Sequence, residues 1–83
     1  MGKILLVDTD RSFTGQDGQN ITTDQPGHAV PGLLAERLFD LGIGVDHIHI
    51  LQNTVSVRRD QDWDAEAESA TLAVVEDFLR FYA

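Results

Sequence analysis

The residues best suited to chemistry in this 83-residue chain are two histidines two positions apart, His47 and His49. Alternation along an extended strand would place both imidazole rings on one face, where two such rings can bind zinc or iron. His28 could add a third ligand, and Asp46 or another carboxylate a fourth. The alternative is that the histidines simply face solvent on a strand with one buried side. The spacing therefore predicts a candidate metal site at His47 and His49, with a purely structural role for the two histidines as the alternative.

A second group combines positive charge with a large aromatic ring. Arg58 and Arg59 are followed by Asp60, Asp62 and Trp63. Trp and Arg are enriched among the residues that dominate binding energy at protein interfaces. Arg58, Arg59 and Trp63 are therefore candidate protein-binding residues. If Trp63 instead packs beneath the last helix, its replacement by alanine is expected to cost roughly 3–5 kcal/mol of stability.

No set of side chains in the sequence has the spacing of catalytic machinery. Asp8 and Asp10 follow an apolar run, as in receiver domains and dehalogenase-type phosphatases, but those folds need a longer chain and a lysine downstream, and Lys3 is the only lysine. The same segment opens like a calcium loop. Phe13 and Gln19, however, stand where such a loop needs Gly and Glu. We expect no enzymatic activity and no bound cofactor.

Composition narrows the function further. The chain is long enough for one domain, residues 1–83, with 42% hydrophobic and 24% charged residues. Its net charge of −8 disfavours nucleic acid and anionic membranes, and is explained either by solubility or by a basic partner. The sequence has no apolar run long enough to span a membrane and no secretory signal, so we expect a cytoplasmic protein. It contains no cysteine, which excludes disulfides, thiolate zinc sites and cysteine-ligated clusters.

The order of apolar runs and turn signals predicts four strands and two helices. Proline 31 opens the first helix, glycine 42 ends it, and an aspartate among 60, 62 and 64 caps the second. The expected strands are a buried one over Lys3–Val7, an edge strand over Gln19–Thr23, and a hairpin of Val45–Ile50 and Thr54–Val57 around Gln52 and Asn53. The order β-β-α-β-β-α predicts an α+β fold, a two-layer sandwich whose four-stranded sheet carries both helices on one face.

Side-chain periodicity predicts which residues these elements bury. In the hairpin, the inward positions are Ile48, Ile50, Val55 and Val57. The helices should face the sheet with stripes at helical spacing: Leu34, Leu38 and Leu41 in the first, and Ala67, Ala70, Val74, Phe78 and Phe81 in the second, with Val75, Leu79 and Tyr82 beside the second stripe.

Over about 50 residues the chain resembles the N-terminal domain of the Nfu/NifU-type iron–sulfur scaffold proteins. The resemblance lies in an ordered series of short segments: Leu34-Ala35-Glu36-Arg37-Leu38-Phe39, Gly44-Val45, Val55-Ser56-Val57 and Asp60-Gln61-Asp62-Trp63. In that family an SPLAERLF helix precedes a GV..V strand, an ITV strand and a helix that starts at DxDW. The first 30 residues depart from the family pattern, since Asp8 to Phe13 stand where a TPNPxxLKF segment is expected.

The resemblance implies a stand-alone relative rather than a scaffold, because the family's second domain, with its CxxC pair, is absent from this sequence. It also implies the same two-layer α+β fold. The function expected from it is protein binding linked to iron–sulfur cluster assembly or delivery, with a cysteine-bearing scaffold or a cluster-receiving protein as partner. The alternative function is a small metal-binding protein that uses His47 and His49.

Overall fold

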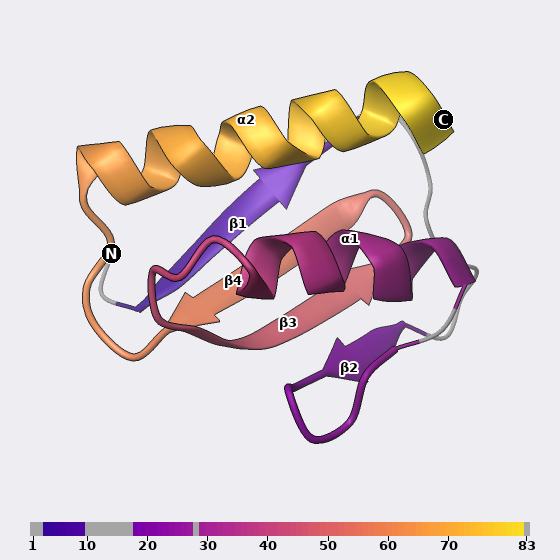
Figure 1. The fold of residues 1–83 in the computed structure, drawn as a ribbon, viewed down its shortest axis with the longest axis horizontal. Helices are drawn as coiled ribbons and strands as arrows, with labels where there is room; N and C mark the ends of the chain where they lie inside the picture. Colours follow the sequence, from indigo (N-terminus) through magenta and orange to yellow (C-terminus); the bar gives the residue numbers. More distant parts are fainter. Residues whose placement is uncertain (1–2, 10–17, 28, 83) are drawn as a thin grey trace.

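The computed structural model describes residues 3–9, 18–27 and 29–82 of the chain. They form an antiparallel four-stranded sheet in the order β1-β4-β3-β2, with two helices (Figure 1). The elements along the chain are β1 (Ile4–Asp8), β2 (Gln19–Ile21), α1 (Ala29–Phe39), β3 (Val45–Leu51), β4 (Thr54–Arg59) and α2 (Ala65–Tyr82). The predicted α+β fold and its element order are confirmed.

The centre of the sheet is the β3–β4 hairpin, joined by a two-residue turn. Leu51 pairs with Thr54, and Gln52 between them has a φ of 53°, which turns the chain back on itself. As predicted, alternate residues of the two strands point into the core, and Ile48, Ile50 and Val55 are fully buried. The hairpin therefore fixes which side chains face the helices and which face away.

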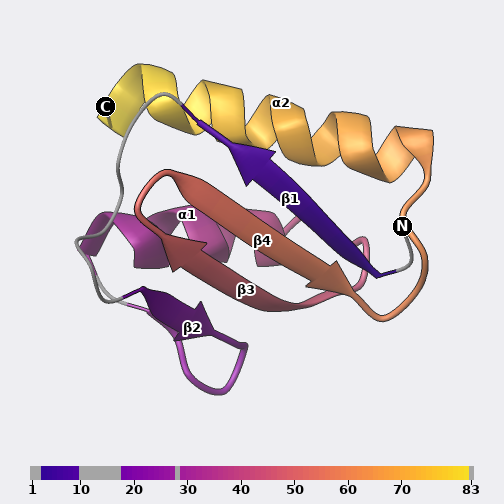
Figure 2. The ribbon, with the colours of Figure 1, turned by 180° about the vertical axis from the view of Figure 1, so that it is seen from behind.

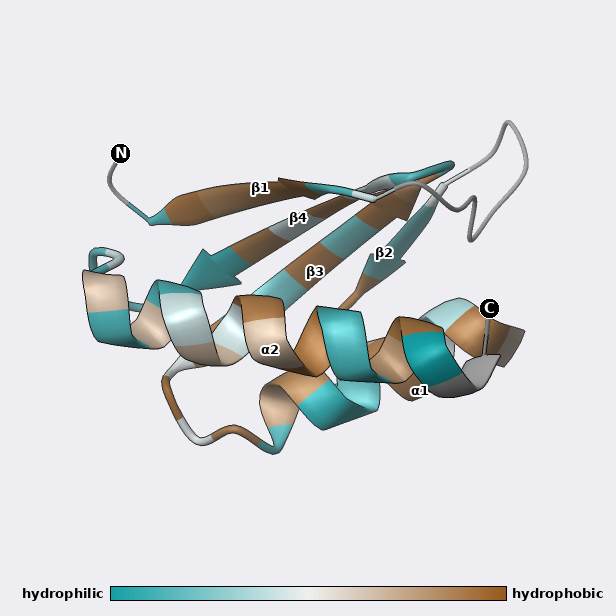
Figure 3. Ribbon diagram, turned by 90° about the horizontal axis from the view of Figure 1, so that it is seen from above, coloured by the Kyte–Doolittle hydropathy of each residue, from teal (hydrophilic) through white to brown (hydrophobic). Residues whose placement is uncertain are grey.

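Both helices lie on the same face of the sheet, as Figures 1 and 2 show from opposite sides and Figure 3 from above. The core between the two layers is built from Leu34 and Leu38 of α1 and Phe78 of α2 against the inward side chains of the hairpin. Arg37 ties the helices together, with its guanidinium over the Phe78 ring and near Asp77 of α2. Neither of the two described helices lies on the other face of the sheet (Figure 3).

Local signals set the helix ends. Pro31 lies in the first turn of α1, where a missing N–H leaves no helical bond unmade. Beyond the end of α1, Gly42 has a φ of 70°, the left-handed conformation expected there. Asp64 caps α2, because its Oδ1 accepts the N–H of Ala67 at 2.8 Å.

The prediction that Lys3–Val7 forms a buried strand is wrong. β1 is at the edge of the sheet, and Ile4 and Leu6 are 53% and 65% exposed, whereas Val7 is buried. A continuous apolar run is typical of a strand covered on both faces. Here the helices cover only one face, so alternate side chains of the run point to solvent.

The buried stripe of α2 differs from the prediction. Ala67 and Phe78 are buried as expected, but Thr71 and Val75 are buried where Ala70 and Val74 were expected. Burial of Thr71 is tolerated because its hydroxyl donates to the carbonyl of Ala67 at 2.9 Å, within the same helix. The side chain of Phe81 lies outside the described residues.

Candidate protein-binding face and corner

The uncovered face of the sheet combines aliphatic and polar side chains, and we call it the open face. Its rows follow from the strand register, because residues directly opposite one another in antiparallel strands lie on the same face. Ile4 lies opposite Arg58, and Leu6 lies opposite Ser56. Ser56 in turn pairs with His49 of β3. The face thus carries apolar residues along β1 and polar residues across β4 and β3.

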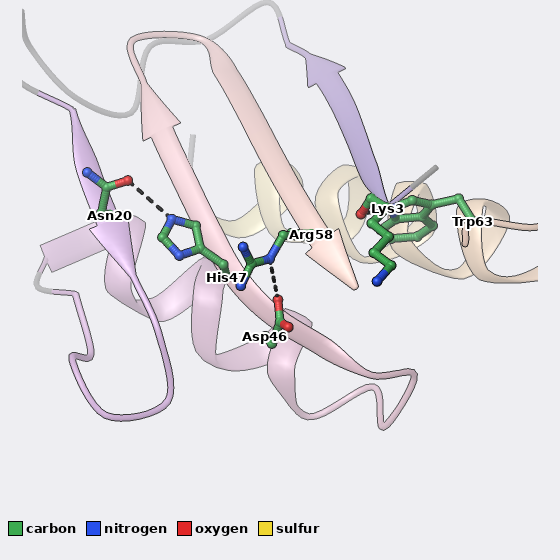
Figure 4. Close-up of polar contacts among 6 residues, drawn as sticks. All are labelled: Lys3, Asn20, Asp46, His47, Arg58 and Trp63. Atoms are coloured by element: carbon green, nitrogen blue, oxygen red, sulfur yellow. Dashed lines mark hydrogen bonds and ion pairs between the residues drawn. The ribbon is translucent and has the colours of Figure 1, made fainter. Parts of the chain in front are cut away.

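His47 and His49 lie on the open face, as the alternation predicted. Both rings point at one atom, the side-chain oxygen of Asn20 in β2, from 3.2 Å for His47 Nε2 and 2.8 Å for His49 Nδ1 (Figure 4 shows the His47 contact). A carboxamide oxygen only accepts hydrogen bonds, so a ring donates to it in the tautomer that has a proton on the nitrogen facing Asn20. The two ring nitrogens therefore converge on one point.

The other suggested metal ligands do not complete this pair. His28 lies outside the described residues. Asp46 Oδ1 instead accepts a hydrogen bond from Arg58 Nε at 2.9 Å (Figure 4). Within residues 3–9, 18–27 and 29–82, no three His, Cys, Asp or Glu side chains are grouped closely enough to hold a metal ion.

The three residues of the candidate protein-binding corner have different environments. Arg58 is half exposed on the open face, next to its ion pair with Asp46. Arg59 is only 5% exposed and donates to two main-chain carbonyls, that of Ile43 from Nε at 2.7 Å and that of Asp62 from Nη1 at 2.8 Å. Trp63 is partly buried and contacts Arg59 and the main chain of Lys3.

Trp63 and Arg59 hold this end of the molecule together. The guanidinium of Arg59 stacks over the indole ring, 5.2 Å from its centroid. The indole N–H of Trp63 donates to the carbonyl of Lys3 at 2.9 Å, which fixes the beginning of β1 against the start of α2 (Figure 4). Of the three residues, only Arg58 presents its charge to solvent. Arg59 and Trp63 hold the end of β4 against the beginning of β1 and the start of α2.

The outer edge of β1 offers main-chain hydrogen-bonding groups to solvent. Arg59 N donates to Lys3 O at 2.9 Å and Thr9 N donates to Asn53 O at 2.8 Å. Because hydrogen-bonded pairs alternate along an antiparallel ladder, the odd-numbered residues of this segment bond to β4, and the main chain of Ile4, Leu6 and Asp8 points away from it. In the described part of the chain no other strand lies on that side.

The described surface has a larger and a smaller groove next to the sheet. The larger, about 360 Å³, runs between α1 and the segment after β2; its described lining residues include Glu36 and Asp40 and none that is basic. The smaller, about 230 Å³, lies between β1 and α2. Its floor is apolar, and Glu76 and Asp8 are among its lining residues; the Asp8 carboxylate itself accepts a hydrogen bond from Thr54 Oγ1 at 2.9 Å, on the side of the open face. Among the described lining residues of the two grooves there is no histidine.

Sequence reasoning identified the histidines and Arg58 but missed Asn20, Ile4 and Leu6. Asn20 could have been found from strand alternation, since it precedes the inward-facing Ile21 in the expected edge strand. The exposure of Ile4 and Leu6 follows only from the sheet order, which no local pattern reveals.

Comparison with protein-family models, curated proteins and solved structures found no match to this chain. The resemblance to the Nfu/NifU N-terminal domain therefore remains a prediction. Neither helix, over the residues described, is long and apolar enough to cross a membrane.

Proposed function

We propose that this chain is a non-enzymatic domain that works by binding another protein through the open face of its sheet. The observation that carries the proposal is the position of Ile4 and Leu6, which are 53% and 65% exposed and adjacent on one strand face. Neighbouring exposed aliphatic side chains on an uncovered sheet lose unfavourable contact with water when a partner covers them.

The polar side of the same face favours a specific partner over indiscriminate association. Arg58 lies directly across from Ile4, and its ion pair with Asp46 is about half exposed. An arginine at the rim of an apolar patch is a common anchor at interfaces, and its planar guanidinium suits carboxylates. The expected contact surface is therefore Ile4 and Leu6 together with Arg58.

The partner that we propose is a cysteine-bearing iron–sulfur scaffold or a protein that receives a cluster. This part of the proposal is supported by the ordered sequence segments of α1, β4 and the start of α2, which resemble the Nfu/NifU N-terminal domain. With no cysteine in the sequence, any thiolates that hold a cluster must belong to the partner. A cytoplasmic location completes the proposal, and a cysteine-free chain is compatible with that compartment.

The test is affinity capture from native lysate with three tagged forms of the full chain: wild type, Leu6→Gln and Leu33→Gln. Leu33 is a matched control, because it is 45% exposed but lies on α1, in the helix layer. We expect wild type and Leu33→Gln to recover the same cysteine-bearing protein, and Leu6→Gln to lose it. Equal recovery by all three forms would refute the open face as the binding surface.

The second candidate function is metal binding at His47 and His49, and one observation favours it. Both ring nitrogens point at the Asn20 side-chain oxygen, so a small shift of the rings would place two nitrogens and one oxygen around a common centre. Zinc needs nitrogen ligands at about 2.0–2.1 Å, and the rings must be unprotonated on the nitrogens that bind it.

Thermal unfolding with added zinc tests this candidate. If the site binds zinc, the midpoint rises with zinc concentration for wild type, and the rise disappears in His49→Ala and on acidification, which protonates the imidazoles. A midpoint that does not respond to zinc eliminates the metal function and leaves the histidines as Asn20-bonded members of the open face.

A further inference from the structure

We propose that the partner adds a strand to the outer edge of β1 and inserts an aliphatic side chain into the groove between β1 and α2. This inference rests on the proposed function, because it names the way in which the same side of the molecule is recognised. The segment that fits is extended, apolar at alternate positions, and basic at the end that lies near Asp8.

The first argument is the main-chain edge. Ile4, Leu6 and Asp8 direct their N–H and C=O groups away from β4, and β1 is the terminal strand of the sheet, at its rim in Figure 3. Such an edge pairs readily with another extended segment. Natural edge strands are commonly protected by a proline, a bulge or an inward-pointing charge. β1 has none of these over Ile4–Asp8, and its register with β4 is continuous.

The second argument is the groove. In an added strand, the residue opposite Val7 points to the helix side of the sheet, because opposite residues share a face. There it meets a groove of about 230 Å³, whose apolar lining is Val7, Leu72, Val75 and Leu79. Pockets for whole small molecules usually measure about 300–1,000 Å³. The groove therefore suits one side chain of a longer segment, and the 39% exposure of Leu72 leaves apolar surface for it to cover.

The third argument is charge. Glu76 lines the groove, and Asp8 borders it at the end of β1, where its carboxylate accepts a hydrogen bond from the Thr54 hydroxyl on the open-face side; none of the described lining residues is basic, on a chain of net charge −8. Arg80 follows one turn later in α2 but is not among the lining residues. A segment with lysine or arginine beside its aliphatic residues is attracted here, and an acidic segment or a second copy of this acidic chain is repelled.

The test begins with a displayed library of random nine-residue peptides selected against the immobilised full chain. We expect the enriched peptides to alternate aliphatic residues and to carry lysine or arginine at one end. Their affinity should fall at least about tenfold in the double variant Asp8→Asn, Glu76→Gln and in Leu72→Ser, and should fall with added salt. The matched controls, Glu36→Gln at the other groove and Leu33→Ser on α1, should bind like wild type.

Two further measurements separate strand addition from side-chain docking. Main-chain N-methylation of the best peptide should abolish binding at every second position and spare the positions between, because only alternate N–H groups face β1. In the labelled full chain, the amide protons of Leu5 and Val7 should exchange slowly with or without peptide. Those of Ile4, Leu6 and Asp8 should exchange rapidly when free and at least about tenfold more slowly when bound.

Several results would overturn the inference: no enriched peptide, an acidic consensus, binding that tolerates N-methylation throughout, or unprotected amides at Ile4, Leu6 and Asp8. These failures are distinguishable from failure of the proposed function. If Leu6→Gln abolishes capture of the natural partner while N-methylation has no effect on the peptides, the open face still binds and only strand addition is refuted.

Discussion

Arg58 and Arg59 are adjacent in sequence but have opposite roles, because alternation along β4 sends one to the open face and the other into the molecule. Arg58 forms a half-exposed ion pair with Asp46. Arg59 is buried, and its guanidinium satisfies the carbonyls of Ile43 and Asp62 while covering the ring of Trp63. The sequence predicted one binding corner from these residues. Only the sheet register could show that their surroundings differ.

Replacing each arginine by alanine tests this difference. Arg59→Ala leaves two carbonyls without their donor and uncovers Trp63, so we expect a loss of about 2–4 kcal/mol in the free energy of unfolding. Arg58→Ala removes an exposed pair and should cost about 1 kcal/mol or less. Urea denaturation of both variants measures the difference. Equal losses would contradict the assignment of Arg59 as the residue that holds the corner.

Two substitutions of Trp63 separate the contribution of its N–H from that of its ring. Trp63→Phe keeps a ring under Arg59 but removes the N–H that donates to Lys3, so the expected cost is about 1 kcal/mol. Trp63→Ala removes the ring as well and should cost roughly 3–5 kcal/mol. Urea denaturation measures both. A Trp63→Ala variant that remains as stable as wild type but loses the partner would show instead that Trp63 acts mainly as a contact residue.

Two glycines control how α1 leads into β3. Gly42 and Gly44 have φ values of 70° and 86°, in the left-handed region that a side chain disfavours. Their surroundings differ: a Cβ on Gly42 would meet nothing within 4 Å, whereas one on Gly44 would collide with the Asp60 carboxylate. Asp60 N also donates to Gly44 O at 2.8 Å, which joins the start of β3 to the end of β4.

The two alanine variants should therefore differ in stability. Gly42→Ala should cost about 1–2 kcal/mol, from the left-handed backbone alone. Gly44→Ala adds the collision with the carboxylate end of the exposed Asp60 side chain, which must rotate away, and should cost up to about 1 kcal/mol more than Gly42→Ala. Thermal unfolding compares them directly. A Gly44→Ala variant no less stable than Gly42→Ala would show that the contact with Asp60 is not rigid.

The elements also show how far local sequence patterns reach. The hairpin, Gly42 after the first helix and the aspartate cap of α2 were predictable because each depends on residues close together in the chain. Which side of α2 faces the sheet was not predictable, because threonine is an unusual core residue. Thr71 can be buried because its hydroxyl bonds to a carbonyl of the same helix. The edge position of β1 depends on pairing with β4, some 50 residues away, for which the sequence carries no local signal.

At the scale of the whole molecule, the two faces of the sheet differ in what covers them. One face is covered by both helices and contains the core. The other carries Ile4 and Leu6 beside Arg58 and the histidine pair. Both described helices lie on one face of the sheet, so the opposite face is left open. The exposed aliphatic side chains of β1, and its outer edge, which pairs with no other described strand, distinguish the open face from an ordinary solvated surface.

The most direct test of the central claim is a chemical-shift map of the labelled full chain, recorded while the captured cysteine-bearing protein is added. We expect the largest changes at the amides of Ile4, Leu6 and Arg58, and little change at Leu33 and Phe39 on α1. Changes confined to α1, with β1 and β4 unaffected, would contradict the claim that this protein binds its partner through the open face and edge of its sheet.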